Sequence, residues 1–156
     1  MGDSDLLGWM FGETTTERPL ILFVCTGNIC RSPFAAEAAR KRLEAAGFEV
    51  GSAGTIADRG RPSTDDAVAA AAELGIDLTA HRSRPVTDDQ LARAEHVYVM
   101  DGTHLDHLRR SRPDAELLDP DGADIADPYG RGIEAYRTAY RTISDAMDRR
   151  LAEWGP

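Results

Sequence analysis

Residues 20–33 decide the fold, and their sequence is LILFVCTGNICRSP. The apolar and β-branched run over residues 20–24 predicts a buried strand, and Cys25 follows at its end. The next residues include Gly27 and Asn28, residue types that tolerate positive φ and so let a loop turn its N–H groups inward. A Ser-Pro pair then suits the first turn of a helix. Strand, loop and helix N-terminus together predict a cradle of unpaired N–H groups for a dianion such as phosphate.

The chemistry expected in this cradle depends on Cys25, Arg31 and Ser32. The field of the loop and of the helix N-terminus favours the thiolate form of a cysteine placed inside it. Ser32 is expected to cap the helix and to donate its hydroxyl to the thiolate. The bare Cys-x5-Arg spacing is weak, since at this composition chance produces it in about one chain in five. The strand before it, and the helical spacing of apolar residues over 34–47, favour the stronger interpretation of a cysteine-dependent phosphatase.

The chain resembles the low-molecular-weight protein tyrosine phosphatases. Their signature is V-C-x-G-N-x-C-R-S-P, and residues 24–33 match it at every fixed position. The likeness extends over about residues 20–154 and keeps the order of the family's other motifs. These motifs are Ser52-Ala53-Gly54-Thr55, Gly75-Ile76-Asp77, His81-Arg82-Ser83-Arg84, Met100-Asp101 and Asp127-Pro128-Tyr129. The resemblance implies an enzyme that hydrolyses protein phosphotyrosine through a cysteinyl-phosphate intermediate.

Hydrophobic periodicity along the chain predicts strands that alternate with helices. The expected strands are 20–24, 49–53, 96–100 and 115–118, and the expected helices are 32–46, 64–74, 88–94, 103–110 and 133–154. This alternation indicates an α/β fold: a single three-layer domain with a four-stranded parallel sheet flanked by helices and the phosphate loop after the first strand. The active site of such a sheet lies beyond the carboxyl ends of the strands. Residues 19–156 are expected to form this domain, and residues 1–18 a short flexible extension.

Phosphate-ester cleavage needs an attacking group, neutralisation of the phosphoryl oxygens and a proton for the leaving oxygen. Cys25 is expected to attack, and Arg31 to hold two phosphoryl oxygens together with the loop N–H groups. Asp127 is the expected acid, because it lies in a long irregular loop that can carry it over Cys25. The resemblance implies the same role. Asp119 also precedes a proline, but the resemblance implies Asp127, because only Asp127 is followed by a tyrosine and, shortly after, by the final helix, as in the family.

The resemblance alone implies several further roles. The phosphate-binding loop comprises Thr26, Gly27, Asn28, Ile29, Cys30 and Arg31. The hydrogen-bond network that holds this loop in shape comprises Asn28, Ser32, Ser52 and His81. Ile29 and Tyr129 form the wall that the substrate contacts. Cys30 is expected to form a reversible disulfide with an oxidised Cys25 and so protect it, although a small packing residue is the alternative.

The substrate class stays open among relatives that share this loop. The resemblance implies threonine at position 29 in protein-arginine phosphatases, so Ile29 favours phosphotyrosine. Tyr129, however, is not followed by a second aromatic residue, which leaves fewer rings to stack on a phenyl group. A protein-arginine phosphatase or a small aryl-phosphate phosphatase is therefore the alternative. Arsenate reductase is disfavoured because no cysteine follows Cys30, and a phosphocysteine carrier or an inactive phosphopeptide-binding module because Asp127 is present.

Composition limits the partners and the compartment. With 156 residues, 42% of them hydrophobic, the chain suits one domain, and no apolar segment is long enough to span a membrane. A net charge of −9 argues against nucleic acid, and 17 arginines beside the single Lys41 fit either salt adaptation or a GC-rich genome. The expected partner is a phosphorylated protein or a small phosphate ester, bound by a monomer or weak homodimer. A cysteine needed as a free thiolate indicates the reducing cytoplasm.

The chemistry expected here needs neither a metal nor an organic cofactor. His104 and His107 lie three residues apart on a predicted helix, but no third ligand accompanies them, so both are expected to be solvated. The two cysteines do not make a zinc site, and the sequence has no Walker-type loop.

Overall fold

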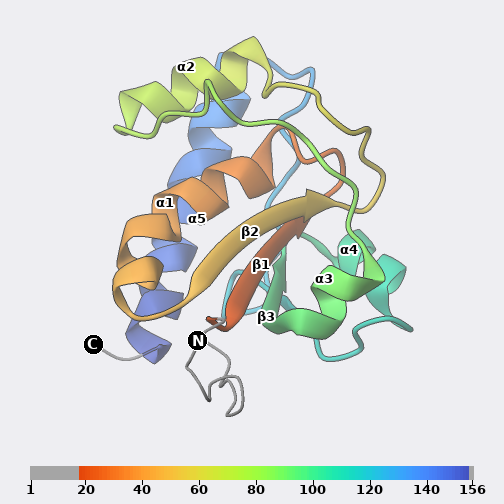
Figure 1. Ribbon diagram of the computed structural model, residues 1–156. Helices are drawn as coiled ribbons and strands as arrows, with labels where there is room; N and C mark the ends of the chain where they lie inside the picture. The colour runs from red at the N-terminus through yellow and green to blue at the C-terminus, as the bar shows by residue number, and fades with distance from the viewer. Residues whose placement is uncertain (1–17, 155–156) are drawn as a thin grey trace, which may run out of the picture.

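Four parallel strands form the centre of the molecule, and five helices surround them in the part of the chain that the structure describes (Figure 1). This structure is a computed structural model, and it describes residues 18–154. In chain order the elements are β1 (Leu20–Cys25), α1 (Arg31–Ala45), β2 (Glu49–Gly54), α2 (Asp65–Glu73), α3 (Asp88–Arg93), β3 (Ala94–Val99), α4 (Gly102–Leu108), β4 (Glu116–Leu117) and α5 (Ile133–Glu153). The predicted extension over residues 1–18 falls, except for Arg18, outside the described residues.

The sheet has the strand order β2-β1-β3-β4, and every neighbouring pair is parallel. β1 is buried along its whole length, which explains its unbroken apolar sequence, since a central parallel strand is covered on both faces. The register pairs Leu20 with Glu49 and Cys25 with Gly54, so β1 and β2 end side by side. The predicted four-stranded parallel α/β fold is therefore confirmed.

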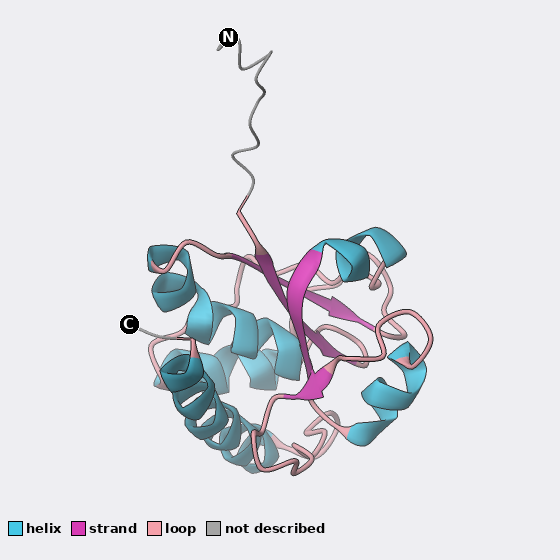
Figure 2. Cartoon of the chain, turned by 90° about the horizontal axis from the view of Figure 1, so that it is seen from below, coloured by secondary structure: helices cyan, strands magenta, loops and turns pink. Residues whose placement is uncertain are grey.

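The two faces of β1 bury two separate hydrophobic clusters. Ile21 and Phe23 belong to the cluster that includes buried residues of α1, α2 and α5. Leu20, Leu22 and Val24 belong to the cluster that includes Leu91 of α3 and Leu108 of α4, as expected when successive side chains point to opposite faces. Figure 2 shows helices on both sides of the strands, which makes the three layers visible.

Several boundaries differ from those predicted. Helix α1 begins at Arg31, and Cys30 occupies its N-cap without a side-chain hydrogen bond, so the prediction that Ser32 caps this helix is wrong. Strand β3 begins at Ala94 rather than 96, and β4 has only two residues. Helix α2 has Thr64 at its N-cap, where the hydroxyl accepts a hydrogen bond from Ala67 N at 3.2 Å. Over residues 18–154, no helix combines the length and the apolar character that crossing a membrane requires.

Candidate active site

The thiol of Cys25 lies at the carboxyl end of β1, facing the first turn of α1. Its Sγ is 3.0 Å from Ser32 Oγ and accepts a hydrogen bond from Ser32 N at 3.4 Å. The Ser32 hydroxyl therefore serves the thiol instead of capping the helix. A hydroxyl and a helix N–H beside the sulfur stabilise negative charge there, which suits a nucleophile.

Asn28 organises the loop that follows Cys25. It is fully buried, and its φ of +57° is the left-handed conformation that asparagine adopts more readily than most residues. Its Nδ2 donates to Ser32 Oγ at 2.8 Å and to Ser52 Oγ at 3.0 Å, and its Oδ1 accepts from Arg84 N at 3.0 Å. The carbonyl of Asn28 lies 2.7 Å from His81 Nε2. Every polar group of this side chain is thus bonded, which holds the loop in its curled shape. Gly27, by contrast, does not use positive φ.

His81 donates a hydrogen bond to the loop. Burial lowers its pKa, although the hydrogen bond to the Asn28 carbonyl opposes the shift. Because a carbonyl only accepts, Nε2 must carry the ring proton and donate it to Asn28 O.

Gly54, at the end of β2, allows the loop to pack directly on the sheet. A Cβ at this position would lie 2.5 Å from Thr26 O and 2.7 Å from the Cβ of Ala57, which no real side chain tolerates. The following residue, Thr55, donates its N–H to Cys25 O at 2.8 Å. Glycine is needed here because the loop backbone at Thr26 lies so close to β2, and the spacing of residues in the sequence does not reveal this contact.

The guanidinium of Arg31 is buried beneath the loop, with 2% of the side chain exposed. Its Nη1 donates to Asp101 Oδ2 at 2.8 Å and to Ile125 O at 2.7 Å, while Nη2 lies 3.8 Å from Asp127 Oδ2. Its Nε is also buried and has no hydrogen-bond partner within residues 18–154. Although burial raises the pKa of Asp101, hydrogen bonds from Thr103 and Arg31 outweigh it and hold this pKa at about 2. A permanent carboxylate therefore orients Arg31 and leaves donor capacity for an anion.

His104 is part of the site, so the prediction that it is solvated is wrong. The side chain is 1% exposed, and its Nδ1 accepts a hydrogen bond from Asp101 N at 3.2 Å. The proton therefore sits on Nε2, which donates to Thr26 Oγ1 at 2.9 Å. Burial lowers the pKa of His104 to about 4, although the Asp101 charge raises it. The Asp-x-x-His capping box at the start of α4 was the signal available in the sequence. His107, as predicted, is exposed.

Asp127 approaches the loop from the segment before α5. Half of its side chain is exposed, and its Oδ1 accepts a hydrogen bond from Tyr129 N at 3.0 Å. The other Asp-Pro aspartate, Asp119, is nearly buried, accepts from Asp121 N and forms an ion pair with Arg149 at 3.3 Å. Asp119 is thus a structural turn residue, and of these two aspartates it is Asp127 that lies near Arg31.

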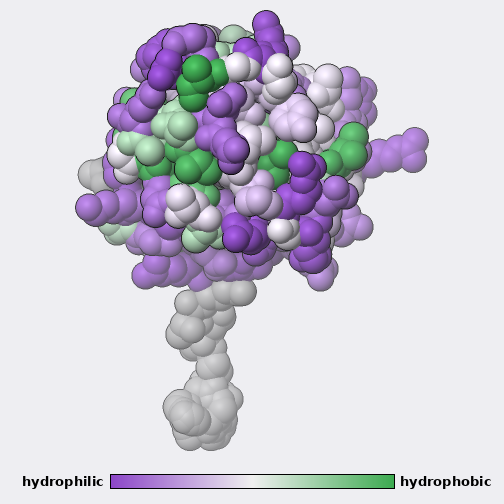
Figure 3. Space-filling view, turned by 90° about the horizontal axis from the view of Figure 1, so that it is seen from above, coloured by the Kyte–Doolittle hydropathy of each residue, from purple (hydrophilic) through white to green (hydrophobic). Residues whose placement is uncertain are grey.

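A cavity of about 230 Å³ brings these groups together. Its lining comprises Cys25, Thr26, Gly27, Ile29, Cys30, Arg31, Arg61, Asp127 and Tyr129. Figure 3 views the end of the molecule to which the strand arrows of Figure 1 point, where small hydrophobic areas lie among hydrophilic ones. The predicted wall residues Ile29 and Tyr129 both reach the cavity, whereas Ser32, Ser52 and His81 lie behind the loop. Arg61 was not predicted; it adds an exposed cation to the rim.

Cys30 lines the cavity, and its thiol also contacts a tyrosine of the core. Its Sγ lies 3.1 Å from the Tyr136 hydroxyl, and its carbonyl accepts from the Tyr140 hydroxyl at 2.7 Å. Burial raises the pKa of Cys30 to about 11, although the bond to Tyr136 lowers it, so Cys30 is a thiol at neutral pH. Both cysteines are free, and within residues 18–154 no group of three or more His, Cys, Asp or Glu side chains is arranged to hold a metal ion.

Comparison with known families matches residues 20–154 to the model described as low molecular weight phosphotyrosine protein phosphatase. The chain belongs to this family. It is therefore a hydrolase of the low molecular weight phosphatase fold. A protein-arginine-phosphatase from Geobacillus stearothermophilus is 39% identical over 141 residues, which cover 85% of this chain and 93% of that protein. A probable low molecular weight protein-tyrosine-phosphatase, EpsP, from Ralstonia nicotianae is 37% identical and covers 82% of this chain and 90% of its own.

Solved structures of this phosphatase family have the same fold as this chain. Wzb of Vibrio vulnificus, in complex with benzylphosphonate, superposes with a TM-score of 0.80 at 30% identity and covers 86% of this chain and 98% of its own. The tyrosine phosphatase AmsI of Erwinia amylovora superposes with a TM-score of 0.81 at 28% identity and covers 89% and 95%.

Proposed function

We propose that this phosphatase hydrolyses protein phosphotyrosine with Cys25 as nucleophile. One observation carries the proposal: Cys25, Arg31 and Asp127 line a single cavity, and the buried Nε of Arg31 has no hydrogen-bond partner among residues 18–154. A phosphoryl group seated in the loop would place its phosphorus at Cys25 and its oxygens at the loop N–H groups and Arg31.

In the first step, the Cys25 thiolate attacks phosphorus. The S–P bond forms as the P–O bond to the tyrosine ring breaks, and Asp127 gives its proton to the leaving phenolate. Arg31 and the loop N–H groups neutralise the charge on the remaining phosphoryl oxygens. The products are cysteinyl-phosphate, tyrosine and an ionised Asp127.

In the second step, ionised Asp127 takes a proton from a water molecule as that water attacks phosphorus. The S–P bond breaks, the electron pair returns to the sulfur, and inorganic phosphate leaves. The Ser32 hydroxyl, 3.0 Å from Sγ, stabilises the thiolate that departs.

A second candidate substrate is protein phosphoarginine. It is favoured by the 39% identity to a protein-arginine-phosphatase, whereas the isoleucine at position 29 and its place in the cavity lining favour phosphotyrosine. A branched apolar side chain narrows the space beside the phosphorus and packs against a ring, while a hydroxyl there would help to orient water.

The experiment is phosphate release from phosphotyrosine and phosphoarginine peptides, side by side, with a chelator present and salt varied up to molar concentration. We expect phosphotyrosine turnover in the wild type, and a shift of the ratio of kcat/KM toward phosphoarginine in Ile29→Thr. If the wild type preferred phosphoarginine, the assignment of phosphotyrosine as substrate would be overturned, and the proposed mechanism would stand. Turnover of neither peptide would overturn the proposal.

The partner is a phosphorylated protein or a small phosphate ester, and we infer that the enzyme works in a reducing cytoplasm as a monomer or weak dimer. The free state of both cysteines supports the reducing compartment. The exposed Arg61 beside the cavity supports an anionic substrate despite the net charge of −9.

A further inference from the structure

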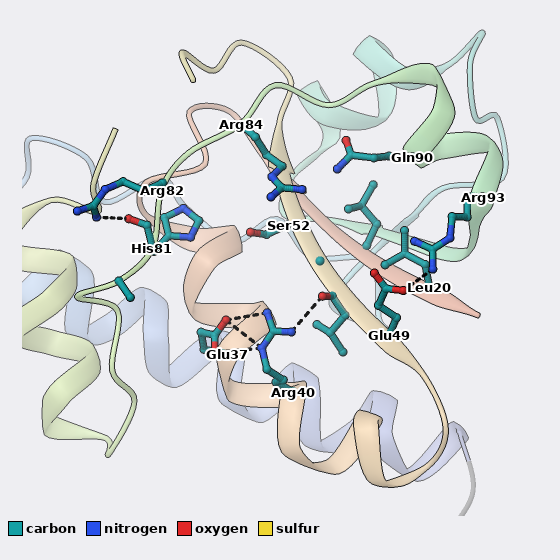
Figure 4. Close-up of a pocket in the computed structure, with 14 residues that line it drawn as sticks. Leu20, Glu37, Arg40, Glu49, Ser52, His81, Arg82, Arg84, Gln90 and Arg93 are labelled. Atoms are coloured by element: carbon teal, nitrogen blue, oxygen red, sulfur yellow. Dashed lines mark hydrogen bonds and ion pairs between the residues drawn. The ribbon is translucent and has the colours of Figure 1, made fainter. Parts of the chain in front are cut away.

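A second, larger cavity of about 530 Å³ runs along the outer edge of β2, apart from the catalytic cavity. Figure 4 shows that its walls come from three elements: Arg40 from α1, Arg84 from the segment before α3, and Arg93 from α3. The floor is formed by β2 itself. Gly51 lies in this floor, and Leu20 and Leu22 of β1 also line the cavity.

Part of the backbone of β2 faces this groove. Glu49 N donates to Pro19 O and Thr55 N donates to Cys25 O, each at 2.8 Å, so the odd-numbered residues of this stretch pair with β1. The backbone N–H and C=O groups of successive residues in a strand point in opposite directions. The groups of Val50 and Ser52 therefore point outward, away from β1. The Val50 carbonyl accordingly accepts a hydrogen bond from Arg40 Nη1 at 3.1 Å.

The next outward-facing residue, Gly54, shows what this edge binds. It donates to Arg84 O at 3.0 Å and accepts from Val86 N at 2.9 Å, which makes a parallel bridge to Pro85. An extended segment of the chain therefore already pairs with the last residue of β2. At Val50 and Ser52, no backbone segment within residues 18–154 continues this pairing, and the groove lies in its place. An open strand edge is a template for one more strand.

The charge of the side chains that line the groove indicates which kind of ligand it binds. Four arginines and two glutamates line it, in a chain whose net charge is −9. Arg40 is paired with Glu37 at 2.8 Å, and Arg93 with Glu49. Arg84 is exposed, its side chain makes no hydrogen bond or ion pair within residues 18–154, and Figure 4 shows its guanidinium over β2. This excess of positive charge is complementary to an acidic segment.

We propose that this groove docks an extended acidic segment of a partner protein, which adds a strand to the edge of β2. The backbone of the segment pairs with Ser52 and with the N–H of Val50, whose carbonyl is already bonded to Arg40, and its acidic side chains lie against Arg84. Ser52 and His81 line the groove and also hold Asn28, so the segment would dock directly behind the phosphate loop rather than in the catalytic cavity. The proposal does not depend on which phosphate ester the enzyme hydrolyses.

The test measures, at low salt, how tightly the full-length protein binds a fluorescent peptide of alternating glutamate and valine. Two control peptides have lysine in place of glutamate, or N-methyl groups on alternate residues that remove the donors of the added strand. Arg84→Glu is compared with Arg109→Glu, an equal charge reversal on an exposed arginine of the turn after α4. Thermal unfolding checks that both variants are folded. Hydrogen exchange of the Ser52 amide reports pairing at the edge itself.

We expect the acidic peptide to bind, to protect the Ser52 amide, and to weaken as salt rises. Arg84→Glu should weaken binding by roughly tenfold, because an attraction becomes a repulsion. Arg109→Glu and wild type should be alike. Equal binding of the lysine or N-methylated peptide, or of Arg84→Glu, would overturn the proposal. Failure of the acidic peptide to bind would also overturn it. The same holds if the free protein is twice the expected size and its Ser52 amide is already protected, because a second copy of the chain would then occupy the groove.

Discussion

The phosphate loop and the segment that carries Asp127 contribute to one cavity but are built in opposite ways. Asn28 at the centre of the loop is fully buried, and all its side-chain polar atoms are hydrogen-bonded. Asp127 is half exposed and is held by one hydrogen bond, from Tyr129 N. The core therefore preorganises the anion site, whereas an exposed turn places the proposed proton donor. Substitutions in the loop should therefore cost stability and activity together, and substitution of Asp127 should cost activity alone.

The largest expected effect is on the nucleophile. Cys25→Ser should lower kcat by about 10⁴-fold or more, because a serine hydroxyl with no base beside it is a poor nucleophile. Phosphate release measures this. Cys30→Ser is the matched control, since its hydroxyl can keep the bond to Tyr136 and the Cys25 thiol stays in place. Equal losses in the two variants would contradict the assignment of Cys25.

Asp127→Asn tests the exposed side of the comparison. The amide cannot donate a proton to the leaving group, so kcat should fall by about 10²- to 10³-fold. The free energy of unfolding should stay within about 0.5 kcal/mol of wild type, as for other exposed positions. Asp119→Asn should show the reverse pattern, with kcat retained and stability lost, since Asp119 is nearly buried and paired with Arg149.

Asn28→Ala tests the buried side. It removes three hydrogen bonds and leaves partners of the loop unsatisfied, so the free energy of unfolding should fall by about 3 kcal/mol, together with kcat. Urea unfolding and phosphate release measure the two effects. Asn28→Gly keeps access to positive φ and loses the same hydrogen bonds. If Asn28→Gly were as stable as wild type, these hydrogen bonds would not be what holds the loop.

The smallest effect concerns the link between His104 and the loop. Its pKa of about 4 lies below the ordinary value of 6.5, so between these pH values the unfolded chain binds a proton that the folded chain does not. The stabilisation is fully present above pH 6.5 and is lost as pH falls toward 4, by about 3 kcal/mol. Burial shifts the pKa of His81 in the same direction.

Unfolding by urea across this pH range checks the effect. His104→Asn should flatten the pH dependence, and His107→Asn, on the same helix but exposed, should not. Equal pH dependence in both variants would place the acid sensitivity elsewhere.

The sequence predicted the parts of the site that are local. The strand, the loop and the start of α1 are consecutive, so periodicity and residue type were enough to place Cys25 and Arg31 at the carboxyl end of β1. Family resemblance added Asp127, whose position depends on a distant segment. The role of the Ser32 hydroxyl was only half predicted, because helix capping and contact with the thiol compete for the same oxygen.

The missed features all depend on packing between distant segments. His104 is spaced like a surface residue, and only the contact between α4 and the loop buries it against Thr26. Gly54 is required because the loop carbonyl of Thr26 passes so close to β2. Arg61 reaches the cavity rim because its loop is tied to Ser83, whose hydroxyl accepts from Arg61 N at 2.9 Å. Residue patterns along the sequence do not predict such contacts between distant segments.

In the proposed mechanism the phosphoryl group passes through the sulfur of Cys25. The most direct measurement is rapid acid quenching of wild-type enzyme during turnover of a radiolabelled phosphotyrosine peptide, followed by digestion and mapping of the label. We expect label on the peptide that contains Cys25, and none in Cys25→Ser. Turnover with no labelled enzyme peptide at any quench time, or label on a residue other than Cys25, would contradict it.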